Sequence, residues 1–281
     1  MARQAQGELD LGDLPRPLVR VTPAKLTTWT GCRRRYRMAY LDRPAPSRGG
    51  AWAHSTLGAV VHSALRALFE LAPGRRRPHT AAGLVAAHWS DEGFAGEAQA
   101  ARYRSRAQDW VARYVEKLDP DLDPVGVERW VSTPTRRIVA EGRVDRIDER
   151  DGDLVVVDYK TGKQELTDDD ARGSQALALY AVAARRTLRR ECRRVELHHL
   201  PSGKVAGWEH TEQSLGRHLQ RAEEAADEIA LATDTLLAGG DPEILFPPST
   251  SRACSWCDFR RHCPEGRAAA PDLDSWALLA P

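Results

Sequence analysis

The sequence contains no long apolar run and no secretory leader, and its charges almost cancel. Its first twenty residues are polar and include prolines, unlike a signal peptide. No uninterrupted apolar stretch approaches the ~20 residues that a membrane-spanning helix needs. The 281 residues carry a formal net charge of +1, so the total charge does not mark a nucleic-acid-binding protein. We therefore expect a cytoplasmic protein that makes no membrane contact.

The basic residues are gathered into local runs. These runs lie at 33–37, 75–77 and 185–194. Such runs are usually solvated faces, and they become phosphate-binding candidates only where they flank a site.

Cysteine is scarce, with five residues at uneven spacing. In a reducing compartment an odd count of this kind favours metal or cluster ligation over disulfides. Three cysteines form a compact C-terminal set, namely Cys254, Cys257 and Cys263. A fourth ligand would be Cys32 or Cys192. From spacing alone, a structural Zn²⁺ site also fits, with His262 as a substitute for one cysteine.

The chain changes character near Pro120 and Pro124, where helical periodicity gives way to strand composition. Before this point, helices are predicted at 23–40, 56–71 with Thr56 as the N-cap, 80–92 and 97–118. After it, strands are predicted at 125–131, 136–148, 153–160, 193–200 and 204–210, and helices at 171–190 and 211–237. We expect a leader at 1–20, a single domain at 21–266 and a tail at 267–281.

Two aspartates are predicted to face each other across a hairpin. Asp151-Gly152 is a strong signal for a two-residue turn. With these two residues as the loop, Asp145 lies directly opposite Asp158, with Cβ atoms ~5 Å apart on one face. Two like charges there would destabilise the sheet, and a bridging divalent cation would remove the repulsion. Lys160 joins the same face because side chains alternate along a strand.

Carboxylate oxygens beside a lysine indicate a particular chemistry. Hard oxygens suit Mg²⁺ or Mn²⁺, and a metal beside a lysine suits phosphodiester hydrolysis. The metal would activate water, while Lys160 would position or deprotonate the nucleophile. The alternative is that these are strand-end charges in solvent, each paired with an arginine. The register also sets Arg143 opposite Lys160, and we expect Arg143 to reach towards a phosphate.

These residues resemble the PD-(D/E)XK nuclease superfamily, and within it the RecB-family exonucleases and the related Cas4 nucleases. The stretches GRVDRID at 142–148 and VVVDYKTGK at 155–163 are similar to the family signatures GxxDRxD and hxDYKTGK. The resemblance implies that Asp145 and Asp158 bind the metal and that Lys160 is catalytic.

The resemblance also implies the fold. It predicts an α/β protein with a restriction-endonuclease-like core, in which helices flank a mixed central sheet. An N-terminal helical region occupies 21–120, the catalytic sheet and its helix occupy 121–210, and a helix with the cysteine segment occupies 211–266.

Further candidate residues come from the same resemblance. The stretch LGAVVHSAL at 57–65 is similar to the family's GxxxH helix, which makes His62 a metal ligand. The alternative is a core-edge histidine bonded to backbone. Glu128, on the strand before Asp145, is a candidate for a further ligand, although a surface glutamate fits equally well.

Substrate contacts are expected on the helix after the lysine. The family carries a glutamine and a tyrosine there, usually four residues apart, whereas Gln175 and Tyr180 are five apart. Five residues turn a helix through ~140°, so the two do not share a face. Tyr180 fits the pattern better than Gln175.

For the cysteines, the resemblance implies a [4Fe–4S] cluster. The RecB-family and Cas4 nucleases that carry such a cluster have one cysteine far upstream and three near the C-terminus. This arrangement assigns the four ligands Cys32, Cys254, Cys257 and Cys263. Cys192 is left over, and we expect it in the core.

Together, these features predict a metal-dependent DNA nuclease. The resemblance implies an exonuclease that acts on single strands or free ends in DNA repair or recombination. The alternatives are a nucleic-acid-binding subunit with a nuclease fold, acting with a separate helicase, and a zinc-stabilised binding module. The aromatic residues proposed to stack on unpaired bases are Trp29, Tyr36, Trp52 and Trp256.

Overall fold

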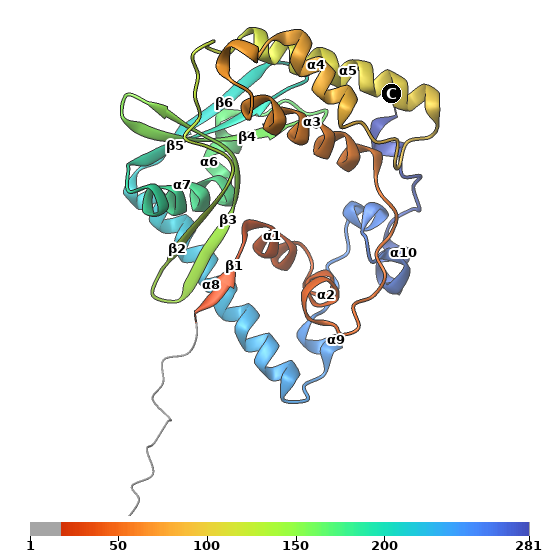
Figure 1. Ribbon diagram of the computed structural model, residues 1–281. Coiled ribbons are helices and arrows are strands. Elements are labelled where there is room, and N and C mark those ends of the chain that lie inside the picture. The colour runs from red at the N-terminus through yellow and green to blue at the C-terminus, as the bar shows by residue number, and fades with distance from the viewer. Residues whose placement is uncertain (1–17, 281) are drawn as a thin grey trace, which may run out of the picture.

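The computed structural model describes residues 18–280, and its centre is a mixed sheet of six strands (Figure 1). The strands are β1 (Val19–Val21), β2 (Gly126–Pro134), β3 (Ile138–Arg150), β4 (Asp153–Lys160), β5 (Cys192–His199) and β6 (Lys204–Glu209). β1 and β4 both pair with one edge of β3, β5 and β6 follow β4 in that order, and β2 pairs with the opposite edge of β3. The β1–β3 and β4–β5 pairs are parallel, and the others are antiparallel. This architecture confirms the predicted α/β class.

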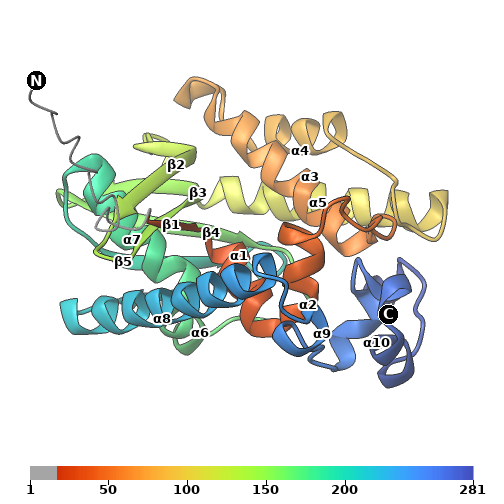
Figure 2. The ribbon, with the colours of Figure 1, turned by 90° about the horizontal axis from the view of Figure 1, so that it is seen from below.

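Helices cover both faces of the sheet and extend beyond it on one side (Figures 1 and 2). They are α1 (Pro23–Gly31), α2 (Arg33–Tyr36), α3 (Ala53–Phe69), α4 (Pro78–Ala87), α5 (Glu97–Glu116), α6 (Asp168–Gly173), α7 (Gln175–Leu188), α8 (Glu212–Leu237), α9 (Pro242–Leu245) and α10 (Pro264–Ala269). A π-helical turn follows α2 at Arg37–Leu41, and 3₁₀ turns lie at Pro73–Arg75, Arg252–Trp256, Arg260–His262 and Ala277–Leu279. Within residues 18–280, no helix is both long enough and apolar enough to cross a bilayer.

Strand β4 is buried on both faces, which explains its run of three valines. Val155 and Val157 are 2% and 0% exposed and pack with residues of α3 and α5. Val156 is also 0% exposed and packs with α7 on the opposite face. A strand covered on both faces has a continuous apolar sequence, unlike a half-exposed strand. The two charged residues Asp158 and Lys160 follow at the carboxyl end of this core.

The β3–β4 hairpin has the register predicted from its turn. Asp151 and Gly152 have φ values of 53° and 90°, the left-handed conformation of a type I′ turn. The ladder then continues as far as the pair of Arg146 with Val157. Regular pairing stops one position before Asp145 and Asp158.

One edge of β3 is shared by two strands that leave a gap between them. β4 pairs with residues 146–150, and β1 pairs with residues 138–140 on the same edge, while β2 covers the opposite edge. Figure 1 shows β4 at the upper end of β3 and β1 at its lower end. Residues 141–145 therefore pair with neither strand on this edge, and the sheet opens at the level of Asp145.

Three helices differ from the prediction at a single residue each. The helix predicted at 23–40 is broken at Cys32, whose backbone is extended and whose sulfur caps α2. Thr56 is inside α3 and does not cap it, since α3 begins after Trp52. The helix predicted at 171–190 divides at Ser174, whose hydroxyl caps α7. Periodicity locates the apolar face of a helix, but it does not locate the residue at which a new helix begins.

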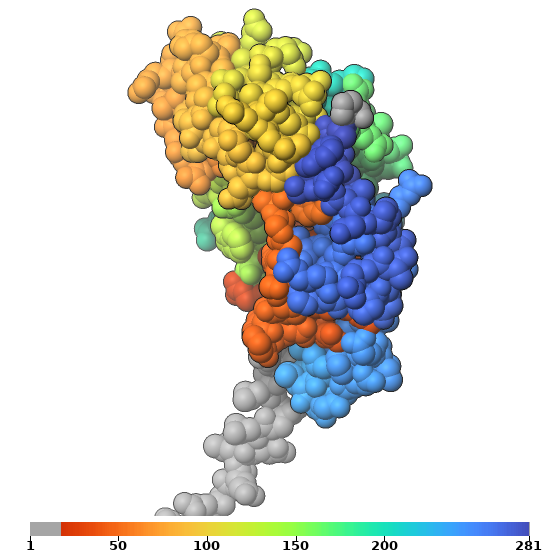
Figure 3. All heavy atoms as spheres, turned by 90° about the vertical axis from the view of Figure 1, so that its right-hand side faces the viewer, coloured from red at the N-terminus to blue at the C-terminus, as the bar shows by residue number. Residues whose placement is uncertain are grey.

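The sequence predicts a tail from residue 267. In the structure, the C-terminal residues instead pack onto the helical half of the molecule. Leu279 is buried among residues of α3 and α5, and its carbonyl accepts a 2.5 Å hydrogen bond from the Tyr103 hydroxyl. The backbone N–H of Ala53 donates to the Ser275 carbonyl at 3.0 Å. Figure 3 shows this dark blue segment against the yellow α5 and the orange linker before α3. Residues up to 280 are thus part of the folded body. At the other end, β1 begins inside the predicted leader, of which residues 1–17 lie outside the described part.

Candidate functional site

Three acidic residues, one from each of three neighbouring strands, lie where β3 parts from β4. In the β2–β3 register Glu128 is opposite Asp145, and the regular ladder skips both residues. In the β3–β4 register Asp158 is opposite Asp145 on the other side. Glu128 has a φ of 47°, a left-handed conformation that costs a non-glycine residue free energy and that clusters at functional sites. The sheet is therefore locally irregular at the level of its acidic residues.

Helix α3 brings His62 against Asp145. Nδ1 of His62 lies 3.4 Å from Asp145 Oδ2, and its Nε2 lies 3.2 Å from the carbonyl oxygen of Tyr159. Because a carbonyl only accepts hydrogen bonds, a neutral His62 carries its proton on Nε2 and keeps the lone pair of Nδ1 facing Asp145. The backbone N–H of Tyr159 donates to Asp145 Oδ2 at 2.9 Å. Tyr159 thus fixes both side chains, and it lies between Asp158 and Lys160 in the sequence.

His62, Glu128 and Asp145 form a compact set of ligand atoms. One atom from each lies within 4.8 Å of the other two, and all three residues are half-buried. Bonds of ~2.1 Å place the ligands of a small divalent cation within about 4 Å of each other. The set therefore fits one such ion, with two hard carboxylate oxygens and one imidazole nitrogen as donors.

The pKa values around this set reflect burial first and neighbouring charges second. Burial raises the pKa of Glu128, and Asp145 raises it further, although Arg143 lowers it. Burial raises the pKa of Asp158 in the same way, against the charge of Lys160. For His62, burial lowers the pKa, but the hydrogen bond that a protonated Nδ1 donates to Asp145 and the charge of Asp145 outweigh burial, and the net pKa is raised. A cation bound among these groups would relieve their repulsion.

Asp158 lies outside the compact set and pairs with Lys160. Its Oδ2 is 2.5 Å from Lys160 Nζ, and the two side chains are 18% and 44% exposed. Both side chains thus share one face, as strand alternation predicts. The register keeps Asp158 opposite Asp145, as the turn predicts, and Asp145 also groups with His62 and Glu128. A half-buried carboxylate takes the nearest cation, and for Asp158 that cation is the lysine two residues on.

Comparison with known proteins assigns a family to this arrangement. The profile of the PD-(D/E)XK nuclease superfamily matches residues 20–264, which include His62, Glu128, Asp145, Asp158 and Lys160. The chain belongs to the PD-(D/E)XK nuclease superfamily. Among solved structures it is similar to that of a "putative exonuclease" from Eubacterium rectale, with 12% identity, a TM-score of 0.47, and coverage of 86% of this chain and 87% of that chain. No curated protein matches the sequence.

Tyr180 approaches the carboxylates of this PD-(D/E)XK chain from α7. Burial and the negative charges of Asp158 and Asp145 raise its pKa to about 12. Its ring packs directly on Gly142 of β3, where an added Cβ would lie 2.6 Å from Tyr180 Cε1. The glycine of the GRVDRID stretch therefore leaves room for the tyrosine ring.

The other two predicted substrate residues are placed differently. The Gln175 amide lies 3.4 Å from the His218 carbonyl on α8, so this side chain is directed towards α8. Arg143 pairs with Trp130 of β2 on one edge of β3. On the other edge the ladder with β4 ends at Arg146, so the predicted pairing of Arg143 with Lys160 does not form. Nε of Arg143 is 2.7 Å from Glu128 Oε2.

A buried polar network lies beneath the site, and the sequence patterns do not predict it. Arg146 and Asp148 are 1% and 0% exposed and form an ion pair. Nε of Arg146 lies 2.8 Å from Asp148 Oδ1, and its Nη2 donates to Asp148 Oδ2 at 2.9 Å. Its Nη1 donates to the hydroxyls of Tyr114 at 2.8 Å and Tyr159 at 3.1 Å. These contacts join β3, β4 and α5 by side chains at the position where the backbone ladder ends. The sequence feature that could have indicated this network is the Arg-x-Asp spacing after Asp145, because it places two opposite charges on one face of a strand.

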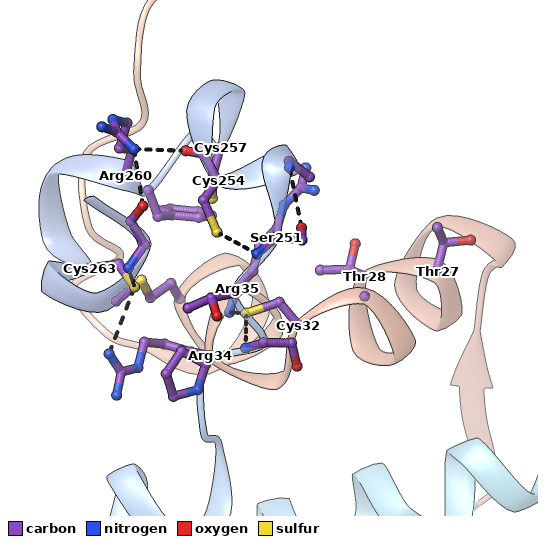
Figure 4. Close-up of a pocket in the computed structure, with 18 residues that line it drawn as sticks. Thr27, Thr28, Cys32, Arg34, Arg35, Ser251, Cys254, Cys257, Arg260 and Cys263 are labelled. Carbon is purple, nitrogen blue, oxygen red and sulfur yellow. Dashed lines mark hydrogen bonds between the residues drawn. The ribbon is translucent and has the colours of Figure 1, made fainter. Parts of the chain in front are cut away.

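The four predicted cysteine ligands line one cavity of about 170 Å³ between the α1–α2 region and the C-terminal segment (Figure 4). They are Cys32, Cys254, Cys257 and Cys263. Three of the sulfurs accept backbone N–H groups at 3.4–3.5 Å, donated by Arg35 and Ser249 to Cys32, by Ser251 to Cys254, and by Gly266 to Cys263. Hydrogen bonds of this kind stabilise thiolates and influence the reduction potential of a metal centre that the sulfurs hold.

The sulfurs of these cysteines are not gathered into a compact set. In the described part of the chain, no three cysteine sulfurs lie within 4.8 Å of one another. Tetrahedral zinc, with Zn–S bonds of ~2.3 Å, holds its sulfurs about 3.8 Å apart. His262 lies outside the cavity, with Nε2 3.0 Å from the Ser47 carbonyl. Cys192 is 0% exposed in the core, as expected, and burial raises its pKa to about 12.

The packing of Tyr180 on Gly142 predicts that Gly142→Ala destabilises the fold by about 1–3 kcal/mol, because the new methyl group overpacks a half-buried ring. Gly162→Ala is the matched control, since an added Cβ there meets no atom within 4 Å. Denaturant unfolding of both variants measures the difference. Equal stability of the two variants would show that the ring does not need the glycine.

Proposed function

We propose that this chain is a divalent-metal-dependent deoxyribonuclease that acts on single strands or free ends as an exonuclease. One arrangement carries the proposal, namely the compact His62–Glu128–Asp145 set beside the Asp158–Lys160 pair in a PD-(D/E)XK chain. Carboxylates that can hold a metal ion beside a lysine are suited to hydrolysis of phosphodiesters, because both positive charges stabilise the negative charge of the transition state.

Each residue has a distinct role in this proposal. His62, Glu128 and Asp145 would hold Mg²⁺ or Mn²⁺, with Asp158 as the neighbouring carboxylate. Such an ion, when bound, activates water and neutralises charge on the phosphate. Lys160 would position the attacking water, and its ammonium charge would stabilise the negative charge that the phosphate gains. Tyr159 would keep Asp145 and His62 in place through its backbone N–H and carbonyl.

A phosphate can approach an acidic site only when positive charges lie beside it. Arg66 and Arg143 supply such charges, with side chains 54% and 61% exposed. The charge of each lowers the pKa of Glu128, so both are close to the acidic set. These exposed cations support a nucleic-acid substrate, which we propose to be DNA handled in repair or recombination.

The alternative is a nucleic-acid-binding subunit that acts with a separate helicase. The close contact of Lys160 with Asp158 favours the enzyme, because binding alone does not require a lysine held against a half-buried carboxylate.

We also propose a [4Fe–4S] cluster in the four-cysteine cavity. The wide spacing of the sulfurs and the cavity of about 170 Å³ favour a group larger than a zinc ion. The cluster would join the start of α2 to the C-terminal segment and would act as a structural staple. Since its thiolates must stay reduced, this proposal places the protein in the cytoplasm.

Asp158→Ala should lower Mg²⁺- or Mn²⁺-dependent cleavage of end-labelled DNA at least ~10²-fold, because the lysine loses its partner and the metal loses a neighbouring carboxylate. Asp153→Ala, an exposed residue at the other end of the same strand, is the control and should retain full activity. Full cleavage by Asp158→Ala would disprove the catalytic assignment.

Cys254→Ser should remove iron from anaerobically purified protein and destabilise the fold, because a staple between distant segments is lost. Cys192→Ala provides the comparison and should retain its iron, since this thiol lies in the core away from the cavity. Iron analysis and visible absorption measure both. A colourless wild-type protein that contains zinc would contradict the cluster.

A further inference from the structure

The aromatic residues expected to stack on bases are mostly inaccessible. Trp29 and Tyr36 are 3% and 5% exposed, and their rings pack edge to face at 5.3 Å. Trp52 and Trp256 are half-buried near the C-terminal segment. An unpaired base needs an exposed ring, which the buried residues Trp29 and Tyr36 do not offer.

Trp130 on β2 has the exposure that the other candidates lack. It is 54% exposed, which is unusual for a tryptophan on a sheet, whereas its neighbour Val131 is 0% exposed and packs with α7. Because side chains alternate along a strand, Trp130 projects from the face opposite to α7. A single exposed ring is not by itself a binding surface, so its neighbours decide what it can bind.

The position of Trp130 relative to the acidic site is set by β3. Its cross-strand partner is Arg143, and directly opposed residues have side chains on one face, with Cβ atoms ~5 Å apart. Arg143 is itself 61% exposed, and its Nε is 2.7 Å from Glu128 Oε2. A flat aromatic surface, a guanidinium and the proposed metal ligands therefore follow one another along a short path on β2 and β3.

We propose that Trp130 and Arg143 form the subsite for one unpaired nucleotide of the substrate. The base would stack on the Trp130 indole, and the phosphate of the same strand would bind Arg143 on its way to the carboxylates. A stacking surface needs a base with a free face, so this subsite selects single-stranded nucleic acid over intact duplex. The inference rests on the proposed function, since it assumes that the acidic site acts on phosphodiesters.

The test measures binding without cleavage, by fluorescence anisotropy of a labelled single-stranded oligonucleotide in EDTA. Trp130→Ala should weaken binding about tenfold or more, as the loss of one stacked base predicts, while Trp130→Phe should stay within about threefold of wild type. Val205→Ala is the matched control, since Val205 is 52% exposed on β6 at the opposite edge of the same sheet. It should bind like wild type.

Arg143→Gln gives a second and independent readout. Loss of one phosphate contact should reduce the slope of log Kd against log salt by ~0.7 for a single strand, whereas Trp130→Ala should leave this slope unchanged. Equal affinities of Trp130→Ala, Val205→Ala and wild type would overturn the subsite and leave the nuclease proposal intact. A wild-type protein that neither binds the oligonucleotide in EDTA nor cleaves it with Mg²⁺ or Mn²⁺ would instead contradict the proposed function itself.

Discussion

The crowding of negative charge where β3 separates from β4 is the constraint on which the site depends. Glu128, Asp145 and Asp158 come from three adjacent strands at one level. Burial, and to a lesser degree the charge of Asp145, raises the pKa of both Glu128 and Asp158. A sheet without a function at this position would gain stability by replacing them with neutral residues. Their presence is explained if a cation compensates the repulsion, and the His62 nitrogen lies where a further ligand of that cation is needed.

The rest of the fold holds this unfavourable arrangement in place. The β3–β4 ladder stops at Arg146, and side chains take over the connection from there. Asp145 accepts the Tyr159 N–H, while Arg146 reaches the Tyr159 hydroxyl from the buried face. Because a buried arginine with satisfied partners is costly to disturb, this network fixes the two strands just beside the carboxylates. Side-chain contacts thus connect β3 and β4 at the opening of the sheet, where their backbone pairing has ended.

The sequence was sufficient to predict the hairpin, because an Asp-Gly turn fixes a register by itself. The contact of Asp158 with Lys160 followed from strand alternation. The left-handed conformation of Glu128 could not be predicted, since no local pattern requires it. The role of Arg146 was also missed, because a charged residue in a strand looks exposed until its buried partners are known. Trp130 was overlooked for the reverse reason, since alternation does not reveal which face of a strand remains uncovered.

The central claim is that one divalent cation compensates the acidic residues at the opening of the sheet. Calorimetric titration of the protein with Mn²⁺ tests it most directly, because binding is measured without substrate or turnover. The account predicts a bound ion in wild type and an affinity at least ~10-fold weaker in Asp145→Asn, which keeps the shape of the side chain but removes its charge. A wild-type protein that binds no Mn²⁺, or an Asp145→Asn variant that binds it equally well, would contradict the account.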